Sequence, residues 1–259
     1  MARQKLGQHF LGDAGWRRRI LETLPRSAGD VWLEIGAGHG EMTQIIAQEG
    51  RRVIAVETDT RLAAGLRAKS REWKDVDVVT EDILKADLAA LIGKTRVRVY
   101  GNLPYYITSP ILHRLFEHAE WIASIHIVIQ FEVAVRIVAK PGRRAYGYLS
   151  AACQFYTRPE IVLRIPPGAF RPPPKVTSAL VRMTLPGERE DLGIRDDATF
   201  MRFVQTCFEQ KRKTLRNNLR GGVSDERIYD ALEALGLQPN ARAEQLGLRE
   251  FAGLFGRLG

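Results

Sequence analysis

The sequence predicts an α/β protein with a parallel sheet, followed by a small helical domain. Short segments rich in Val, Ile and Leu recur from residue 31 to residue 129, separated by helical segments, which is the pattern of repeated β–α units. A glycine-rich turn follows the first of these strands. Turn formers and charges interrupt the pattern at residues 185–191, and apolar residues beyond them keep only helical spacing. We therefore expect two domains, residues 1–185 and residues 192–259.

The individual elements follow from local signals. Apolar segments predict strands at residues 31–35, 52–56, 76–79, 97–100 and 125–129, with closing strands at 149–155 and 179–183. A helix is expected at residues 42–48, and a second begins at Thr108-Ser109-Pro110, capped and with proline in its first turn. The spacing of Phe200, Phe203, Val204 and Cys207 predicts a helix that continues through residue 216. Two more helices are expected at residues 228–235, before Gly236, and at residues 251–255.

The turn after the first strand has the composition of a ligand-binding loop. Gly36, Gly38 and Gly40 let the backbone approach a ligand closely, and the following helix offers unpaired N–H groups at its start. A dinucleotide fingerprint needs its third glycine where this chain has Glu41, so the turn fits NAD poorly. A Gly-x-Gly-x-Gly turn fits S-adenosylmethionine better.

Polar residues end the next three strands. Glu57 ends the second, where its carboxylate can accept both hydroxyls of a ribose. Asp82 follows the third and can accept from the adenine amine of the same cofactor. From Gly36 to Glu57, Asp82 and Asn102 the steps are 21, 25 and 20 residues, each the length of one β–α unit. We therefore expect all four positions along one edge of the sheet.

Asn102-Leu103-Pro104-Tyr105 is the most informative stretch of the chain. The Asn102 side-chain oxygen and the Leu103 carbonyl are hydrogen-bond acceptors, and proline holds the residue before it in extended geometry. Tyr105 offers a flat ring on which a base can stack. Two acceptors beside an aromatic ring suit the exocyclic amine of a nucleobase, although a strand-to-helix turn has similar composition. We nominate no general base, and interpret Glu132 and His126 as structural.

Composition indicates a soluble globular protein with a segregated positive charge. The 259 residues have a mean hydropathy of -0.20 and a net charge of +9. Residues 136–182 carry nine basic and one acidic side chain, residues 202–220 six and one, and residues 1–26 six and two, whereas the rest has a net charge of -8. Such segregation is typical of a nucleic-acid footprint, with solvated helix faces as the alternative. Cys153 and Cys207 have no metal-like spacing, so neither zinc nor a disulfide is expected. The N-terminus lacks an apolar signal core, so we expect a cytoplasmic protein without membrane spans.

The motifs together resemble the ribosomal RNA adenine N6,N6-dimethyltransferases, from about Gln4 to Phe255. The resemblance rests on six stretches, which are residues 7–11 (GQHFL), 33–40 (LEIGAGHG), 102–105 (NLPY), 146–150 (YGYLS), 170–176 (FRPPPKV) and 211–219 (KRKTLRNNL). Two positions depart from the family pattern: His9 and Tyr106 each stand where asparagine is common.

The resemblance implies a function and a set of site residues. It implies a Rossmann-like methyltransferase sheet with a small C-terminal α-helical domain. The enzyme would use S-adenosylmethionine to dimethylate two adjacent adenosines near the 3′ end of small-subunit rRNA during subunit biogenesis. The implied cofactor residues are His9, Leu11, Gly36, Gly38, Glu57, Asp82 and Asn102. The implied catalytic residues are Asn102, Leu103, Pro104, Tyr105 and Phe170, with base stacking by Tyr105 and Phe170. For RNA contact we expect Lys211, Arg212, Lys213, Arg216, Arg143 and Arg144. We expect a monomer that acts on small-subunit precursor particles without a metal.

Three alternatives stay open at this point. One is the related methyltransferase that modifies large-subunit rRNA and confers macrolide resistance, which Leu103 and the basic C-terminal motif disfavour. Another is a DNA adenine-N6 methyltransferase, in which a second proline is usual at the position of Leu103. The third is a ribosome-assembly or transcription factor that keeps the fold without needing the activity.

Overall fold

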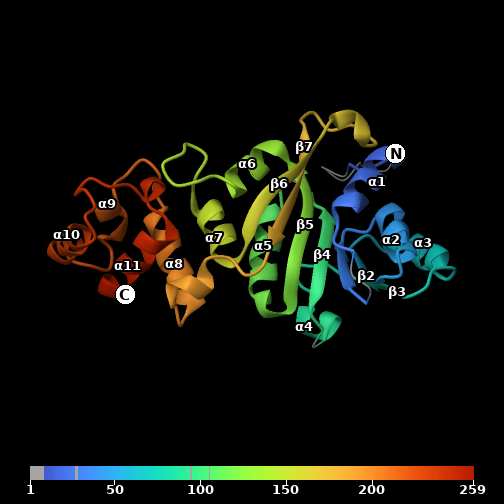
Figure 1. Cartoon of the computed structure of the whole chain (residues 1–259), viewed down its shortest axis with the longest axis horizontal. Helices are drawn as coiled ribbons and strands as arrows, with labels where there is room; N and C mark the ends of the chain where they lie inside the picture. The colour runs from blue at the N-terminus through green and yellow to red at the C-terminus, as the bar shows by residue number, and fades with distance from the viewer. Residues whose placement is uncertain (1–8, 27–28, 94, 105) are drawn as a thin grey trace. The chain divides into compact units, whose positions relative to one another are not determined.

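A computed structural model describes residues 9–26, 29–93, 95–104 and 106–259 (Figure 1). Its strands are β1 (Val31–Ile35), β2 (Arg52–Glu57), β3 (Val76–Thr80), β4 (Val97–Asn102), β5 (Ile122–Gln130), β6 (Arg158–Ile165) and β7 (Ser178–Thr184). Its helices are α1 (Ala14–Thr23), α2 (Glu41–Gln48), α3 (Thr60–Ser70), α4 (Leu88–Ile92), α5 (Thr108–Phe116), α6 (Phe131–Ile137), α7 (Tyr148–Tyr156), α8 (Asp197–Cys207), α9 (Leu215–Leu219), α10 (Asp225–Ala234) and α11 (Leu248–Leu258).

One seven-stranded sheet organises the N-terminal part, with the order β3-β2-β1-β4-β5-β7-β6. The pairs among β1 to β5 are parallel, and β7 runs antiparallel to β5. The chain moves outward from β1 to β2 and β3, then returns to place β4 on the other side of β1. Ligands bind at such a reversal, because the connections leave a crevice at the carboxyl ends of the strands. The predicted α/β class with a parallel sheet is confirmed.

The core of this sheet explains why the chain forms these elements. Ile20 of α1 and Ile46 of α2 are buried against Trp32 and Tyr100, which lie on one face of the sheet. The strands are almost continuously apolar because helices cover them, as parallel sheets require. Among the residues that the structure describes, none of the helices combines the length and apolar character needed to cross a bilayer.

The contacts divide the chain into two compact units. One unit contains Met1–Ala134 with Glu160–Leu185, and the other contains Val135–Pro159 with Pro186–Gly259. The predicted boundary assigned all of residues 1–185 to the first domain, so residues 135–159 differ. They group with the C-terminal helices because Phe155 packs on Phe200, with ring centroids 5.2 Å apart, and Tyr146 packs on Phe208 at 5.9 Å.

In the middle of the chain one strand prediction is wrong, and one strand was not predicted. Residues 149–155 form helix α7 instead of a strand. The amide of Gly147 donates to the Ser150 hydroxyl at the start of this helix, and Ala151 and Ala152 favour helix. A strand, β6, lies just beyond, and it was not predicted because it contains Pro159. Proline is tolerated there because β6 ends the strand order, at the edge of the sheet.

Two predicted helix features also differ. The helix expected through residue 216 ends at Cys207, and a new helix, α9, begins after Thr214. The Asn218 amide causes the break, since it donates to the Cys207 carbonyl at 2.7 Å and accepts from the Gln210 amide at 3.2 Å. Helix α5 begins at Thr108 without a side-chain cap, because its N-cap residue is Ile107, and the Thr108 hydroxyl donates to the Pro104 carbonyl.

Candidate active site

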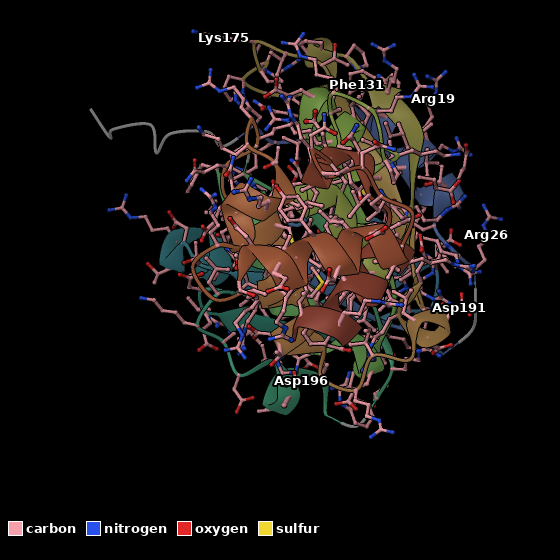
Figure 2. All side chains as sticks on the ribbon, turned by 90° about the vertical axis from the view of Figure 1, so that its left-hand side faces the viewer. Arg19, Arg26, Phe131, Lys175, Asp191 and Asp196 are labelled. Carbon is pink, nitrogen blue, oxygen red and sulfur yellow. The ribbon has the colours of Figure 1, made fainter. Side chains whose placement is uncertain are left out.

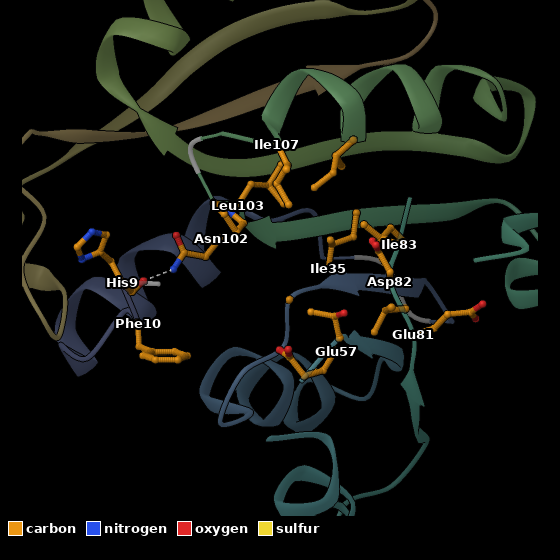
Figure 3. A pocket seen from close by; sticks show the side chains of 15 residues that line it. His9, Phe10, Ile35, Glu57, Glu81, Asp82, Ile83, Asn102, Leu103 and Ile107 are labelled. Carbon is orange, nitrogen blue, oxygen red and sulfur yellow. Dashed lines mark hydrogen bonds between the residues drawn. The ribbon is translucent and has the colours of Figure 1, made fainter. Parts of the chain in front are cut away.

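An open pocket of about 110 Å³ lies where β1, β2, β3 and β4 end (Figure 3). Figure 3 shows Glu57, Asp82 and Asn102 reaching the same space from different strands. The expectation that these positions and Gly36 share one sheet edge is confirmed. Ile35, Val56, Ile83 and Ile111 supply apolar walls.

The glycine turn forms the floor beside β1. Gly36 has φ +72° and an exposed position, and its amide donates to the Val56 carbonyl at 2.8 Å. A Cβ on Gly36 would point into open space, so the backbone itself faces the pocket. Gly38 has φ +60°, and a Cβ there would approach the Phe10 ring to 3.0 Å. Both glycines are therefore required by backbone conformation, and Gly38 also by packing.

Glu57 holds this turn in place. Its Oε2 accepts from the Gly38 amide at 2.8 Å, and its Oε1 accepts from the Asp59 amide at 2.9 Å. The side chain is buried, so these charge-assisted bonds fix the direction of the carboxylate. Each oxygen has a further lone pair, which suits a pair of vicinal hydroxyls.

Asp82 stands opposite, after the end of β3. Its Oδ1 accepts from the Leu84 amide at 3.0 Å, which closes a tight turn and directs the carboxylate. Glu81 and Ile83, its neighbours, also line the pocket. A carboxylate beside an apolar wall can accept from an amine while the wall contacts a flat ring.

Asn102 is the last residue of β4, and its orientation is set by the N-terminal arm. Its Nδ2 donates to the His9 carbonyl at 2.7 Å, a bond drawn in Figure 3. The Leu103 amide donates to the Val128 carbonyl at 3.0 Å, so the strand-like course continues into the pocket wall. Gly101 makes this possible, since a Cβ there would meet the Leu103 side chain at 2.8 Å and the Ile35 carbonyl at 3.1 Å.

The arm at residues 9–13 is itself tied to the segment after β6. Phe10 and Arg171 exchange backbone hydrogen bonds of 3.1 and 2.8 Å, and a ring nitrogen of His9 lies 2.8 Å from the Pro172 carbonyl. His9 and Phe10 line the main pocket, and Leu11 lines a second cavity next to it. The arm therefore brings together the predicted cofactor residues and Asn102.

Not every predicted residue lies in the pocket. Pro104 lines it, but Tyr105 lies outside the described residues. Phe170 is 1% exposed and packs in the core with Leu11 and Tyr100, so its ring presents no face for stacking. His126 is also buried. Burial, helped by Arg182 and Arg98, lowers the pKa of His126 to about 3, which agrees with a structural role.

The basic residues predicted to contact RNA belong to the C-terminal unit. Lys211 donates to the Arg144 carbonyl at 2.8 Å, so two stretches 67 residues apart meet. Arg143, Arg144, Lys211, Arg212 and Lys213 are exposed, and we call these five residues the basic surface. Arg216 is engaged elsewhere, because it pairs with Asp225 at 2.7 Å and lies over the Tyr229 ring. In the N-terminal unit, basic side chains such as Lys175, Arg19 and Arg26 extend from the ribbon (Figure 2).

Sequence reasoning gave no role to several residues that build the pocket. Phe10 and Ile83 line it, and Gly101 permits the close passage of Leu103. The glycine directly before Asn102 was a usable signal, because glycine inside a strand marks a close approach. Within the described residues no three His, Cys, Asp or Glu side chains are grouped to hold a metal ion.

Comparisons with known proteins agree with this geometry. A family model described as ribosomal RNA adenine dimethylase matches residues 1–258. The chain is 41% identical to the ribosomal RNA small subunit methyltransferase A of Koribacter versatilis, across 98% of this chain and 93% of that protein. The protein of the same name from Alkaliphilus metalliredigens is 40% identical, with 97% and 90% covered.

Solved structures share the fold. A dimethyladenosine transferase from Plasmodium falciparum superposes with a TM-score of 0.80 at 23% identity, across 95% of this chain and 96% of that one. The 23S rRNA methyltransferase ErmE superposes with a TM-score of 0.72 at 28% identity, across 96% and 99%. The full-length family match, together with relatives near 40% identity, shows that this chain belongs to the ribosomal RNA adenine dimethylase family.

Proposed function

We propose that the protein uses S-adenosylmethionine to dimethylate the N6 amines of two adjacent adenosines near the 3′ end of small-subunit rRNA. One observation carries the proposal: a chain of this family places Gly36, Glu57, Asp82 and Asn102 around a single pocket. We also propose that it works as a monomer on small-subunit precursor particles, in the cytoplasm, where that RNA is assembled.

The residues of the pocket suit the proposed cofactor. Glu57 presents a fixed carboxylate for two ribose hydroxyls, and Asp82 accepts from the adenine amine beside Ile83. The backbone at Gly36 faces the pocket without a side chain between. When bound, S-adenosylmethionine supplies an electrophilic methyl group on a sulfonium. His9, Leu11 and Gly38 complete the proposed set, with His9 and Gly38 acting through the hydrogen bonds described above.

Asn102 and Leu103 prepare the amine. The nitrogen lone pair of adenine N6 is delocalised into the ring, so the amine is a poor nucleophile. Hydrogen bonds from its two hydrogens to the Asn102 Oδ1 and the Leu103 carbonyl draw the nitrogen toward tetrahedral geometry. The bond from Asn102 Nδ2 to the His9 carbonyl supports this role, because it commits the amide nitrogen and leaves the oxygen as the acceptor. Neutral dipoles suit a transfer that disperses positive charge, and alignment contributes much of the rate.

The second transfer changes what the pocket must hold. A monomethylated amine has one hydrogen, so one acceptor loses its partner while the site accommodates a methyl group. We propose that Tyr105 stacks on the base and allows it to slide, with Pro104 stiffening the wall. Phe170 is buried in the core, which argues against the stacking role that the resemblance implies for it.

The basic surface supplies the proposed contact with RNA phosphates. Its five side chains are exposed, and the bond from Lys211 to the Arg144 carbonyl joins its two parts. Arg216 contributes less to phosphate binding in this proposal, since Asp225 already neutralises it.

The proposed function and the resistance-type alternative differ in the RNA that is modified. ErmE, named for 23S rRNA, has the same fold, but the relatives at 37–41% identity carry the small-subunit name. This difference in similarity favours small-subunit rRNA.

A labelling experiment tests the proposal. The protein is incubated with labelled S-adenosylmethionine and, in parallel, with small and large ribosomal subunits that lack adenine dimethylation, and the modified nucleotides are mapped. We expect label only in dimethyladenosine near the 3′ end of small-subunit rRNA. Label in large-subunit rRNA would support the resistance-type alternative. Binding of cofactor and subunit without transfer would support the inactive assembly factor.

A further inference from the structure

A second, smaller cavity, of about 30 Å³, adjoins the main pocket at the glycine turn. Gly36, Phe10 and Asn102 line both spaces, so the two are neighbours at the proposed site of transfer. Glu34, Tyr100 and Glu41 give the second cavity a polar lining. None of these three has a part in the mechanism described above.

Two buried polar atoms in this cavity lack partners. Glu34 and Tyr100 face each other in register across β1 and β4, and their side chains are 2% and 1% exposed. In the described part of the chain, neither the Glu34 Oε2 nor the Tyr100 hydroxyl has a hydrogen-bond partner. Leaving such groups unsatisfied is costly, so their presence beside a ligand pocket indicates that something polar completes them.

The surroundings of Glu34 disfavour a negative charge. Burial raises the pKa of the Glu34 carboxyl to about 8, the Thr43 hydroxyl opposes this, and the carboxylates of Glu41 and Glu57 add to it. Across the strand pair, Tyr100 is uncharged, since burial raises the pKa of its hydroxyl further, with Glu34 adding to the effect. The titratable groups that act on Glu34 are thus acidic and favour its neutral form. A cation that arrived beside Glu34 would favour the charged form instead.

We propose that Glu34 faces the cationic end of the cofactor and that cofactor binding is coupled to the release of the Glu34 proton. The proposal rests on the proposed use of S-adenosylmethionine. The neutral carboxyl of the unliganded protein loses its proton to solvent, and the resulting carboxylate pairs with the positive charge that enters. No bond other than the O–H bond breaks in this step.

The coupling makes affinity depend on pH in a defined direction. Below about pH 8, binding must first remove a proton from Glu34, so affinity rises as pH rises and levels off above that value. The expected slope approaches about tenfold per pH unit between pH 6 and pH 7. At pH 7 the number of protons released approaches about one.

Calorimetry on the full chain tests this directly. S-adenosylmethionine is titrated into wild type, Glu34→Gln and Glu41→Gln, in two buffers that differ in ionisation enthalpy, at pH 6, 7 and 8. We expect wild type and Glu41→Gln to release close to one proton at pH 7, and Glu34→Gln to release roughly none. Glu41→Gln is the matched control because Glu41 lines the same cavity and the substitution is the same.

Two further measurements keep the outcome interpretable. Carbon-13 NMR of the glutamate carboxyls in the unliganded protein should show one group that titrates near pH 8 and is missing in Glu34→Gln. The neutral analogue 5′-methylthioadenosine should bind without releasing that proton. Cofactor binding with equal proton release in wild type and Glu34→Gln would overturn the inference while the proposed function stands. A protein that did not bind S-adenosylmethionine at any pH would overturn both.

Discussion

The Glu57 side chain both holds the glycine turn in place and offers hydrogen-bond acceptors to the pocket. Its two oxygens accept from the Gly38 and Asp59 amides, and the same oxygens face the pocket. Glu34, two residues before Gly36, is the contrasting acid, because burial keeps it neutral. The surroundings of the two glutamates therefore differ, since Glu57 accepts from two backbone N–H groups whereas burial dominates at Glu34.

Replacing Glu57 by alanine should weaken S-adenosylmethionine binding. Two ribose hydroxyls would lose a charged acceptor, at about 1.5–3 kcal/mol per hydrogen bond. Calorimetry measures the affinity, and circular dichroism confirms that the variant is folded. Asp59→Asn is a suitable control, because the hydrogen bond from position 59 to Glu57 is made by the backbone amide, which the substitution keeps. An unchanged affinity in a folded Glu57→Ala protein would remove Glu57 from the site.

Glu34→Gln should stabilise the unliganded protein at alkaline pH. The pKa of Glu34 is raised from 4.5 to about 8 on folding, so its contribution to stability is complete below 4.5 and is lost as pH rises through 8. Glutamine carries no such dependence. Urea unfolding should show similar stability at pH 5 and an advantage for the variant on the order of 2–4 kcal/mol at pH 8. A gap between the two proteins that does not change with pH would contradict the burial argument.

At the scale of elements, periodic signals in the sequence located most of the sheet and the crevice. Strands β1 to β5 and β7 were predicted, because buried parallel strands leave unbroken apolar segments between turn formers. The positions of Gly36, Glu57, Asp82 and Asn102 followed from counting β–α units. Helix α7 was missed because five of its nine residues are buried and the rest are half-buried, so it lacks the exposed polar face that marks a helix.

Contacts between distant residues account for the rest. The break between α8 and α9 depends on Asn218 reaching back to the Cys207 carbonyl, which no local pattern reveals. The burial of Phe170 depends on packing with α1 and the arm. The second cavity arises only when β1 and β4 pair and bring Glu34 opposite Tyr100.

Asn218→Ala should destabilise the C-terminal unit. The change leaves the buried Cys207 carbonyl and the Gln210 amide without their side-chain partner, at about 1–3 kcal/mol. Chemical denaturation measures the loss. Asn217→Ala is the matched control, since the Asn217 side chain is exposed, and it should change stability by less than about 0.5 kcal/mol. Equal effects of the two changes would show that Asn218 does not terminate α8.

For the whole molecule, the two units have different roles in the proposed function. The unit built on the sheet contains the pocket, whereas the basic surface lies in the other unit. Chemistry and RNA affinity should therefore respond to different substitutions. This separation gives two predictions, one for each unit.

Reversing Lys211, Arg212 and Lys213 to glutamate should weaken small-subunit binding steeply at low salt. Each lost phosphate contact lowers the slope of log affinity against log salt by roughly 0.7–0.9, and binding of the cofactor alone should not change. Filter binding across a salt series measures the slope. An unaltered slope would move the footprint to the basic residues of the N-terminal unit, such as Arg171 and Lys175.

Asn102→Ala gives the most direct test of the central claim, that the pocket at the sheet edge activates the adenine amine. Single-turnover methylation of small subunits is followed with separate counting of mono- and dimethyladenosine, beside binding measurements for cofactor and subunit. The Leu103 carbonyl remains in this variant, so binding should survive better than transfer, which should slow by on the order of 100- to 1,000-fold. Transfer at the wild-type rate would contradict the mechanism and would leave residues 102–105 without a catalytic role.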